Sequence, residues 1–170
     1  MTITDAPSTT NLPHWIGGRP VEGASGRTAP VYDPALGRVT KQVPLASEEE
    51  VAAAVASAKA AFPVWSGQSI AKRLAVLFSF RELLNARKAE LAEILTSEHG
   101  KVLSDAAGEI ARGLEVVEFA LSFPHLTKGE FSQNVSTGID VYSVREPLGV
   151  VGIISPFNFP AMVPMWFFPI

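Results

Sequence analysis

The sequence predicts an α/β fold, and two observations carry this prediction. Between residues 47 and 124, apolar side chains recur every three or four positions, which is typical of amphipathic helices. Residues 150–154, Val-Val-Gly-Ile-Ile, instead form a short β-branched run between turn-forming Gly and Pro residues. Such a run predicts a buried strand of the kind found in parallel sheets that are covered on both faces.

Composition and charge restrict the possible classes of function. The chain has 170 residues, is 47% hydrophobic, carries a net charge of −3 and contains no cysteine. Its length fits one domain or an incomplete larger one. No basic stripe is evident, so nucleic acid is not an expected partner, and without cysteine we expect no disulfide and no thiolate metal site. The N-terminus lacks the features of a signal or transit peptide, so we expect a cytoplasmic protein.

The N-terminal part of the chain, up to residue 43, is predicted to form short strands. Residues 1–11 are polar and are expected to be disordered. Two short extended pieces are expected around the Gly-Gly turn within residues 14–21. Further strands are expected over residues 28–32 and 39–43, joined at residues 33–37 by a turn with Asp, Pro and Gly in suitable places.

Four helices are predicted to follow. The first begins at Ser47, because Ser47 and Glu50 have the spacing of a capping box, and it is expected to weaken at Pro63. The other three are expected from near Ser69, over residues 88–98 before a stop at His99-Gly100, and from Ser104 to Pro124. Residues 129–137 are polar and predict a loop, and residues 139–146 predict a strand outside the main core, because both of its faces are mixed.

A turn with one unusual residue follows the predicted buried strand. Residues 155–160 read Ser-Pro-Phe-Asn-Phe-Pro, and Asn158 is the single amide among apolar and proline neighbours. Its NH2 group donates hydrogen bonds and cannot lose a proton at working pH. Because open α/β sheets bind ligands beyond the carboxyl ends of their strands, Asn158 can stabilise an oxyanion there. The alternative is that Asn158 only shapes the turn.

The string Gly-Ile-Ile-Ser-Pro-Phe-Asn-Phe-Pro resembles the segment of NAD-dependent aldehyde dehydrogenases in which an Asn lies between Pro-aromatic and aromatic-Pro. With Phe157 where most of that family has Trp, and with Val-Tyr-Ser-Val-Arg-Glu-Pro-Leu-Gly-Val-Val upstream, it most resembles methylmalonate-semialdehyde dehydrogenases. The resemblance extends from about His14 to Ile170. It implies the N-terminal part of that fold: helices, the start of a doubly wound parallel sheet, and an extended oligomerisation arm. The implied division is a disordered segment 1–11, strands and helices of the cofactor-binding domain over 12–129, the arm over 130–147, and the truncated first part of the NAD-binding sheet over 148–170.

The resemblance also implies site residues. Asn158 matches the oxyanion donor, and Ser155 and Phe157 match contacts of the NAD cofactor. Arg112, in Arg-Gly-Leu-Glu-Val-Val-Glu-Phe-Ala, matches an arginine that helps to bind the substrate carboxylate, a task for which the guanidinium fork is suited. The residues alone equally allow a surface arginine paired with an acid at 109 or 115. No Gly-x-Gly-x-x-Gly occurs, so the NAD assignment rests on the resemblance.

The implied reaction is the oxidation of a short-chain semialdehyde, methylmalonate or malonate semialdehyde, by NAD, with coenzyme A (CoA) as co-substrate and an acyl-CoA as product. The implied enzyme is a homo-oligomer. That family attacks its aldehyde with a cysteine thiolate, so this chain, which has no cysteine, is expected to be an N-terminal fragment that is inactive alone. The alternative is an inactive truncated product that serves at most in folding or subunit assembly. A membrane-spanning role for residues 147–170 is disfavoured by five prolines.

Overall fold

Short strands build the N-terminal part of the computed structural model, which describes residues 10–170. A three-stranded sheet has the order β1-β5-β4, with β1 parallel and β4 antiparallel to β5, and β2 and β3 form a separate antiparallel pair. The bounds are β1 Thr10–Asn11, β2 His14–Ile16, β3 Arg19–Val21, β4 Thr28–Asp33 and β5 Arg38–Pro44. The predicted extended pieces are therefore confirmed. The predicted disorder of residues 1–11 falls mostly outside the described residues, and its last two residues instead form β1.

The predicted turn between β4 and β5 is also present. The carboxylate of Asp33 accepts hydrogen bonds from the backbone N–H groups of Ala35 (3.0 Å) and Leu36 (3.2 Å). Gly37 has a φ of 63°, in the left-handed region that a glycine adopts without steric cost.

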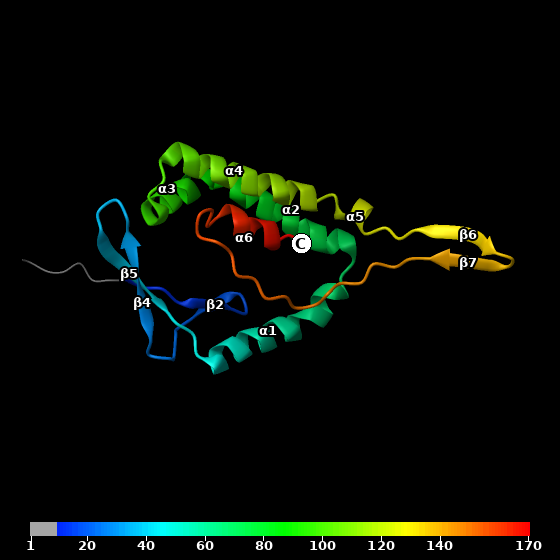
Figure 1. Cartoon of the computed structure of the whole chain (residues 1–170), viewed down its shortest axis with the longest axis horizontal. Helices are drawn as coiled ribbons and strands as arrows, with labels where there is room; N and C mark the ends of the chain where they lie inside the picture. Colours follow the sequence, from blue (N-terminus) through cyan, green and yellow to red (C-terminus); the bar gives the residue numbers. More distant parts are fainter. Residues whose placement is uncertain (1–9) are drawn as a thin grey trace, which may run out of the picture.

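Helices dominate the middle of the chain (Figure 1). Their bounds are α1 Glu48–Ser66, α2 Ile70–Ala86, α3 Lys88–His99, α4 Leu103–Ala120, α5 Phe123–Leu126 and α6 Met162–Phe167. The predicted starts at Ser47 and Ser69 are confirmed, because their hydroxyl groups accept hydrogen bonds from the backbone N–H groups of Glu50 and Lys72. The helix predicted from Ser104 to Pro124 instead spans α4, which ends at Ala120, and the separate α5. The predicted weakening at Pro63 is wrong, since α1 continues to Ser66. No residue of α1 is buried, so water can satisfy the carbonyl that the proline leaves without a donor.

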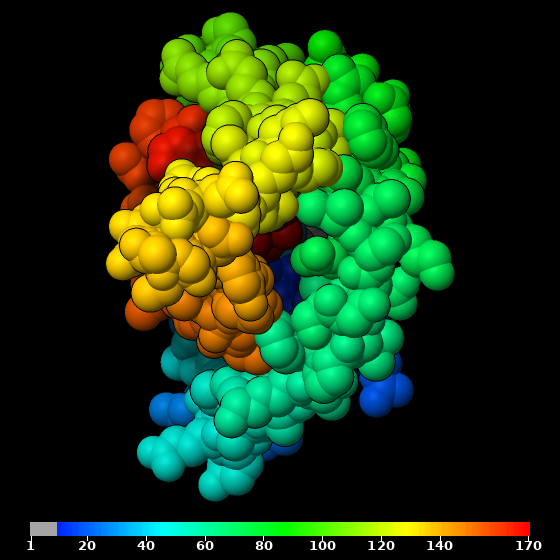
Figure 2. Space-filling view, turned by 90° about the vertical axis from the view of Figure 1, so that its right-hand side faces the viewer, coloured from blue at the N-terminus to red at the C-terminus, as the bar shows by residue number. Residues whose placement is uncertain are grey.

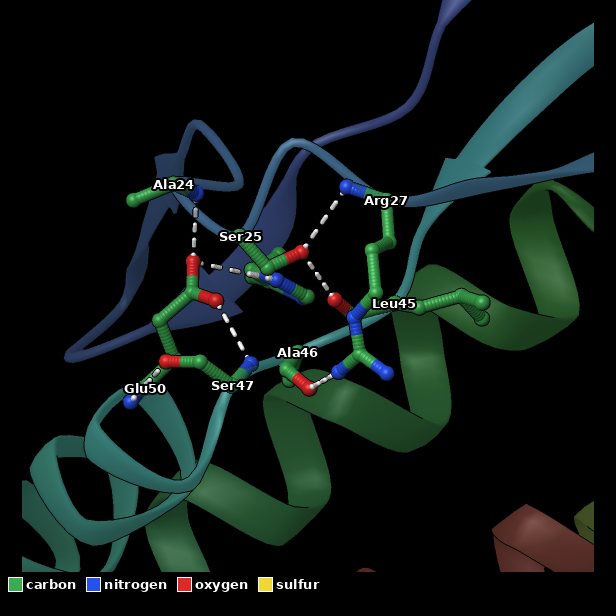
Figure 3. Close-up of polar contacts among 8 residues, drawn as sticks. Ala24, Ser25, Arg27, Leu45, Ala46, Ser47 and Glu50 are labelled. Carbon is green, nitrogen blue, oxygen red and sulfur yellow. Dashed lines mark hydrogen bonds and ion pairs between the residues drawn. The ribbon is translucent and has the colours of Figure 1, made fainter.

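Glu50 joins α1 to the N-terminal strands (Figure 3). Its carboxylate completes the capping box by accepting the backbone N–H of Ser47 (2.7 Å), and it also accepts the backbone N–H of Ala24 (2.6 Å). The hydrogen bonds from Ala24 and Ser47 lower the pKa of Glu50. The same carboxylate lies 3.7 Å from the imidazole of His14, so this histidine is half-buried at the junction rather than free on the surface.

The hydrophobic core lies between α2, α3, α4 and α6. Its buried members are Leu84, Ala92, Leu95, Ala106, Ile110, Val117 and Met165. Helix α4 supplies three of them at helical spacing, and α6 lies beside it (Figure 1). Seen from the end of the molecule that carries the β6–β7 hairpin, the surface is hollowed between α1–α2 and the segment that follows this hairpin (Figure 2). Helix α1 lies outside this core and contributes no buried residue to it.

The hairpin formed by β6 (Phe131–Ser136) and β7 (Ile139–Tyr142) projects away from the helices (Figure 1). The predicted loop over residues 129–137 is wrong for β6, which is a strand. Its polar side chains indicate a loop, but pairing with β7 satisfies the hydrogen bonds of its backbone. All residues of both strands are exposed, as expected for a strand outside the core. Its role as an oligomerisation arm stays a prediction.

The predicted buried strand over residues 150–154 is wrong for this chain. The segment pairs with no strand of residues 10–170, and its side chains are exposed, that of Ile154 completely. A strand that is apolar on both faces needs flanking strands and covering helices, and the described residues provide neither. The α/β class is confirmed by the mixture of sheet and helix, whereas the start of a doubly wound parallel sheet is not formed. None of the helices within residues 10–170 has the length and apolar character needed to cross a membrane.

Gly113 allows α4 and α6 to approach closely, and we expect Gly113→Ala to lower the free energy of unfolding by about 1–3 kcal/mol. A Cβ atom there would lie 2.6 Å from Sδ and 3.2 Å from Cβ of Met165, and 3.3 Å from Cα of Met162. The matched control is Gly108→Ala on the same helix, where a Cβ meets nothing within 4 Å. Because alanine is the better helix former, this control should raise stability by about 0.5–1 kcal/mol. Urea unfolding followed by circular dichroism measures both, and equal effects would contradict the close packing.

Candidate active site

An open cleft lies between the first half of α4 and the turn that precedes α6. Its volume is about 630 Å³, and it is lined by His99, Lys101, Ser104, Asp105, Gly108, Arg112, Asn158 and Phe159. Two residues that the sequence singles out for chemistry, Arg112 and Asn158, therefore line one cleft although they are far apart in the chain. No sequence pattern places them together, because their proximity depends on how α6 packs against α4.

Asn158 lies in a turn at the cleft surface, as predicted. Its backbone carbonyl accepts a hydrogen bond from Nζ of Lys101 (3.2 Å), so the main chain of the turn is attached to the residue before α4. Its side chain is exposed and makes no hydrogen bond to any residue of the described part of the chain. Both N–H bonds of the amide are therefore available to an oxygen atom that enters the cleft.

Arg112 is exposed on α4 and lines the same cleft. The alternative pairing with an acid at 109 or 115 is not observed within residues 10–170. The oxygens of Glu109 bind Lys101 and the backbone at the start of α6 instead. The guanidinium group is therefore free to form two parallel hydrogen bonds with a carboxylate in the cleft.

Sequence reasoning missed the ion pair between Lys101 and Glu109. Nζ of Lys101 lies 2.6 Å from Oε2 of Glu109, whose side chain is 1% exposed. Burial raises the pKa of Glu109, but the hydrogen bonds from Lys101, Met162 and Ala161 outweigh burial and lower it overall. One signal was present: Glu109 falls three residues after the buried Ala106, on the apolar face of α4. An acid in that position must have partners, although the sequence does not name them.

The two residues assigned to cofactor contacts lie elsewhere. The ring centroid of Phe157 is 5.6 Å from that of His99, and Phe157 lines a second cavity of about 460 Å³ that includes residues of β4 and α3. Ser155 is exposed and lines neither cavity. Both side chains are accessible to a dinucleotide, which fits the assignment, but no glycine-rich phosphate turn accompanies them. The phosphates of a dinucleotide would need further contacts, so the roles of Ser155 and Phe157 stay predictions.

The cleft combines charges that suit a small anion with a carbonyl group. Lys101 and Arg112 carry positive charge, Asp105 carries negative charge, and Asn158 supplies a neutral donor. Because Lys101 is held by Glu109, Arg112 is the cation that a ligand can reach without breaking an ion pair. Within residues 10–170, no cluster of three or more His, Asp or Glu side chains is placed to hold a metal ion.

The chain is similar to known proteins along most of its length. The sequence profile described as "Aldehyde dehydrogenase family" matches residues 21–170. Malonate-semialdehyde dehydrogenase of Pseudomonas aeruginosa is 46% identical over 159 residues, which is 94% of this chain and 32% of that protein. The mitochondrial acylating methylmalonate-semialdehyde dehydrogenase of Arabidopsis thaliana is 48% identical over 159 residues, which is 94% of this chain and 26% of that protein.

A solved structure shares the fold as well as the sequence. The crystal structure of a protein described as a methylmalonate-semialdehyde dehydrogenase from Sinorhizobium meliloti, complexed with NAD, superposes with a TM-score of 0.92 and is 48% identical. The match covers 96% of this chain and 33% of that one, so the chain spans about a third of the length of its relatives. Because the family profile extends over nearly all of the sequence and includes both cleft residues, the chain belongs to the aldehyde dehydrogenase family.

Proposed function

We propose that this chain acts as the N-terminal third of an NAD-dependent, CoA-acylating semialdehyde dehydrogenase, with the α4 cleft as part of its substrate site. One observation carries the proposal: Arg112 and Asn158 line the same cleft. The names of the most similar relatives support it, because malonate and methylmalonate semialdehyde each carry an aldehyde and a carboxylate. An amide donor suits the aldehyde oxygen, and a guanidinium group suits the carboxylate.

The role of Asn158 follows from the change of charge at the aldehyde oxygen. When a nucleophile attacks the aldehyde carbon, the carbon becomes tetrahedral and its oxygen gains negative charge. A preorganised donor at that oxygen lowers the barrier, because the hydrogen bond strengthens as the charge develops. The side chain of Asn158 has both N–H bonds available for this, and it remains neutral throughout.

The remaining steps need groups beyond those described here. The family resemblance assigns the attack to a cysteine thiolate, and these 170 residues contain no cysteine. NAD, when bound, would supply the acceptor for the hydride of the aldehyde carbon, and Ser155 and Phe157 would contact this cofactor. The thioester that results would pass its acyl group to CoA, with loss of carbon dioxide when the substrate is methylmalonate semialdehyde.

Assembly into a homo-oligomer is part of the proposal. The β6–β7 hairpin projects from the helices, and it exposes large side chains at Phe131, Val141 and Tyr142. Unpaired strand edges with exposed apolar side chains readily pair with other strands. The exposed residues 150–154 are equally suited to pair with strands outside residues 10–170. Such pairing is also consistent with the alternative, an inactive product that serves only in assembly. A cytoplasmic location stays a prediction.

We expect Asn158→Ala in the full-length enzyme to lower kcat by roughly 10²–10³, the usual loss for one oxyanion donor. The affinity for NAD should change far less, because the amide acts on the substrate oxygen. Asn85→Ala, which removes an exposed amide from α2, is the matched control and should leave kcat unchanged. A kcat for Asn158→Ala within a few-fold of the parent would leave Asn158 with only a structural role.

We expect Arg112→Lys in the full-length enzyme to raise KM for malonate semialdehyde far more than KM for propanal. Lysine keeps the charge but loses the two parallel hydrogen bonds to a carboxylate. Steady-state kinetics on both aldehydes gives the comparison, with Arg19→Lys, an exposed arginine of β3, as the control. Equal losses on the two aldehydes would show that Arg112 does not read the carboxylate.

The 170-residue chain by itself is expected to produce no NADH from a semialdehyde. Oxyanion stabilisation without a nucleophile forms no acyl-enzyme, and the chain has no cysteine. Absorbance of NADH is the measurement, and the full-length enzyme is the positive control. NADH formation by the purified, sequence-verified chain would refute the assignment of the nucleophile.

A further inference from the structure

Lys101 contacts three parts of the candidate site at once. Its Nζ atom lies 2.6 Å from Oε2 of Glu109 and 3.2 Å from the backbone carbonyl oxygen of Asn158. The same ammonium group lies 4.7 Å from the ring centroid of Phe159, a cation–π distance. The side chain of Lys101 is 11% exposed, so these contacts are largely screened from water. Lys101 therefore joins α4 to the turn that carries Asn158.

Glu109 holds the other end of the same turn. Its Oε1 atom accepts the backbone N–H groups of Ala161 (2.8 Å) and Met162 (3.0 Å), where α6 begins. Helix α6 has no N-cap side chain of its own, so a carboxylate from α4 satisfies its first donors. The chain from residue 158 to residue 162 is thus fixed at its first carbonyl by Lys101 and at its last two amides by Glu109.

Such an ion pair is not the arrangement that stability alone favours. Taking two charges out of water is costly, and apolar residues of similar volume often replace a buried pair at no loss of stability. The pair instead fixes the orientation of its neighbours, because charge-assisted hydrogen bonds fix the geometry of the groups that they join. The side chain of Asn158 makes no hydrogen bond within residues 10–170, so its placement depends on the backbone that the pair holds.

We propose that Lys101 and Glu109 are positioning residues that hold the backbone of the Asn158 turn, so that the Asn158 amide meets the reacting oxygen. The inference rests on the proposed function, because it assigns a purpose to the placement of that amide. Oxyanion donors must be held to within a fraction of an ångström to be effective. Neither residue need touch the substrate for this role.

The test is a double-mutant cycle in the full-length enzyme. Lys101→Met is expected to lower kcat by about 10- to 100-fold, the loss that a misplacement of about 1 Å can cause. In an Asn158→Ala background the same change should lower kcat by no more than about two-fold, because no amide is left to misplace. Glu109→Gln, which keeps the oxygen that accepts from Ala161 and Met162, tests the ion pair separately if Lys101→Met does not fold.

Hydrogen exchange supplies a readout that does not depend on activity. Exchange of the Ala161 and Met162 amides should accelerate in Glu109→Gln, because a neutral amide oxygen accepts hydrogen bonds more weakly than a carboxylate does. It should also accelerate in Lys101→Met, because the turn loses its contact at the Asn158 carbonyl. The matched control is Lys41→Met, which removes the ion pair between Lys41 and Glu98 that joins β5 to α3. This control should change neither the exchange at 161–162 nor kcat.

Two outcomes would overturn the inference. Additive losses of kcat in the double mutant would show that Lys101 acts independently of Asn158. Unchanged exchange at 161–162 would show that the pair does not hold the turn. Unchanged kcat in Asn158→Ala alone would instead refute the proposed function, and faster exchange in the Lys101 variant would then assign the pair a purely structural role.

Discussion

The buried carboxylate of Glu109 is the interaction on which the second half of the structure depends. It accepts the first backbone donors of α6 and binds Lys101, which in turn holds the carbonyl of Asn158. A carboxylate that is 1% exposed is tolerated only because each oxygen has hydrogen-bond donors. These donors lower its pKa below that of an ordinary glutamate, so the carboxylate is charged at neutral pH. The stability that it contributes is lost as the pH falls below the ordinary glutamate pKa and through the lowered one.

Helix α4 combines the fold and the candidate site because neighbouring positions on it do different work. Glu109 and Gly113 contact α6, whereas Arg112, three residues after Glu109, is exposed to the cleft. The close approach at Gly113 sets the distance between α4 and α6, and α6 follows directly after the turn that carries Asn158. Helix α4 therefore couples packing to ligand recognition, because this rigid helix places the flexible side chain of Arg112.

Residues 150–154 and the β6–β7 hairpin remain exposed, and they differ from the helices in how their backbones form hydrogen bonds. A helix satisfies its own backbone, so α2, α3 and α4 form and pack locally. A strand needs a neighbour for its hydrogen bonds, and residues 150–154 have none within residues 10–170. The β6–β7 hairpin solves this by pairing with itself, although its faces stay uncovered.

The sequence by itself determined the local features: the α/β class, the helix starts at Ser47 and Ser69, the stop at Gly100 and the turn at Asn158. Each depends on atoms a few residues apart, so a short pattern is sufficient to predict it. Only the tertiary structure decided that Arg112 and Asn158 share a cleft, that Glu109 pairs with Lys101 and that residues 150–154 stay unpaired. These outcomes depend on which distant segments meet, and burial and partners cannot be deduced from the spacing of residues within one segment.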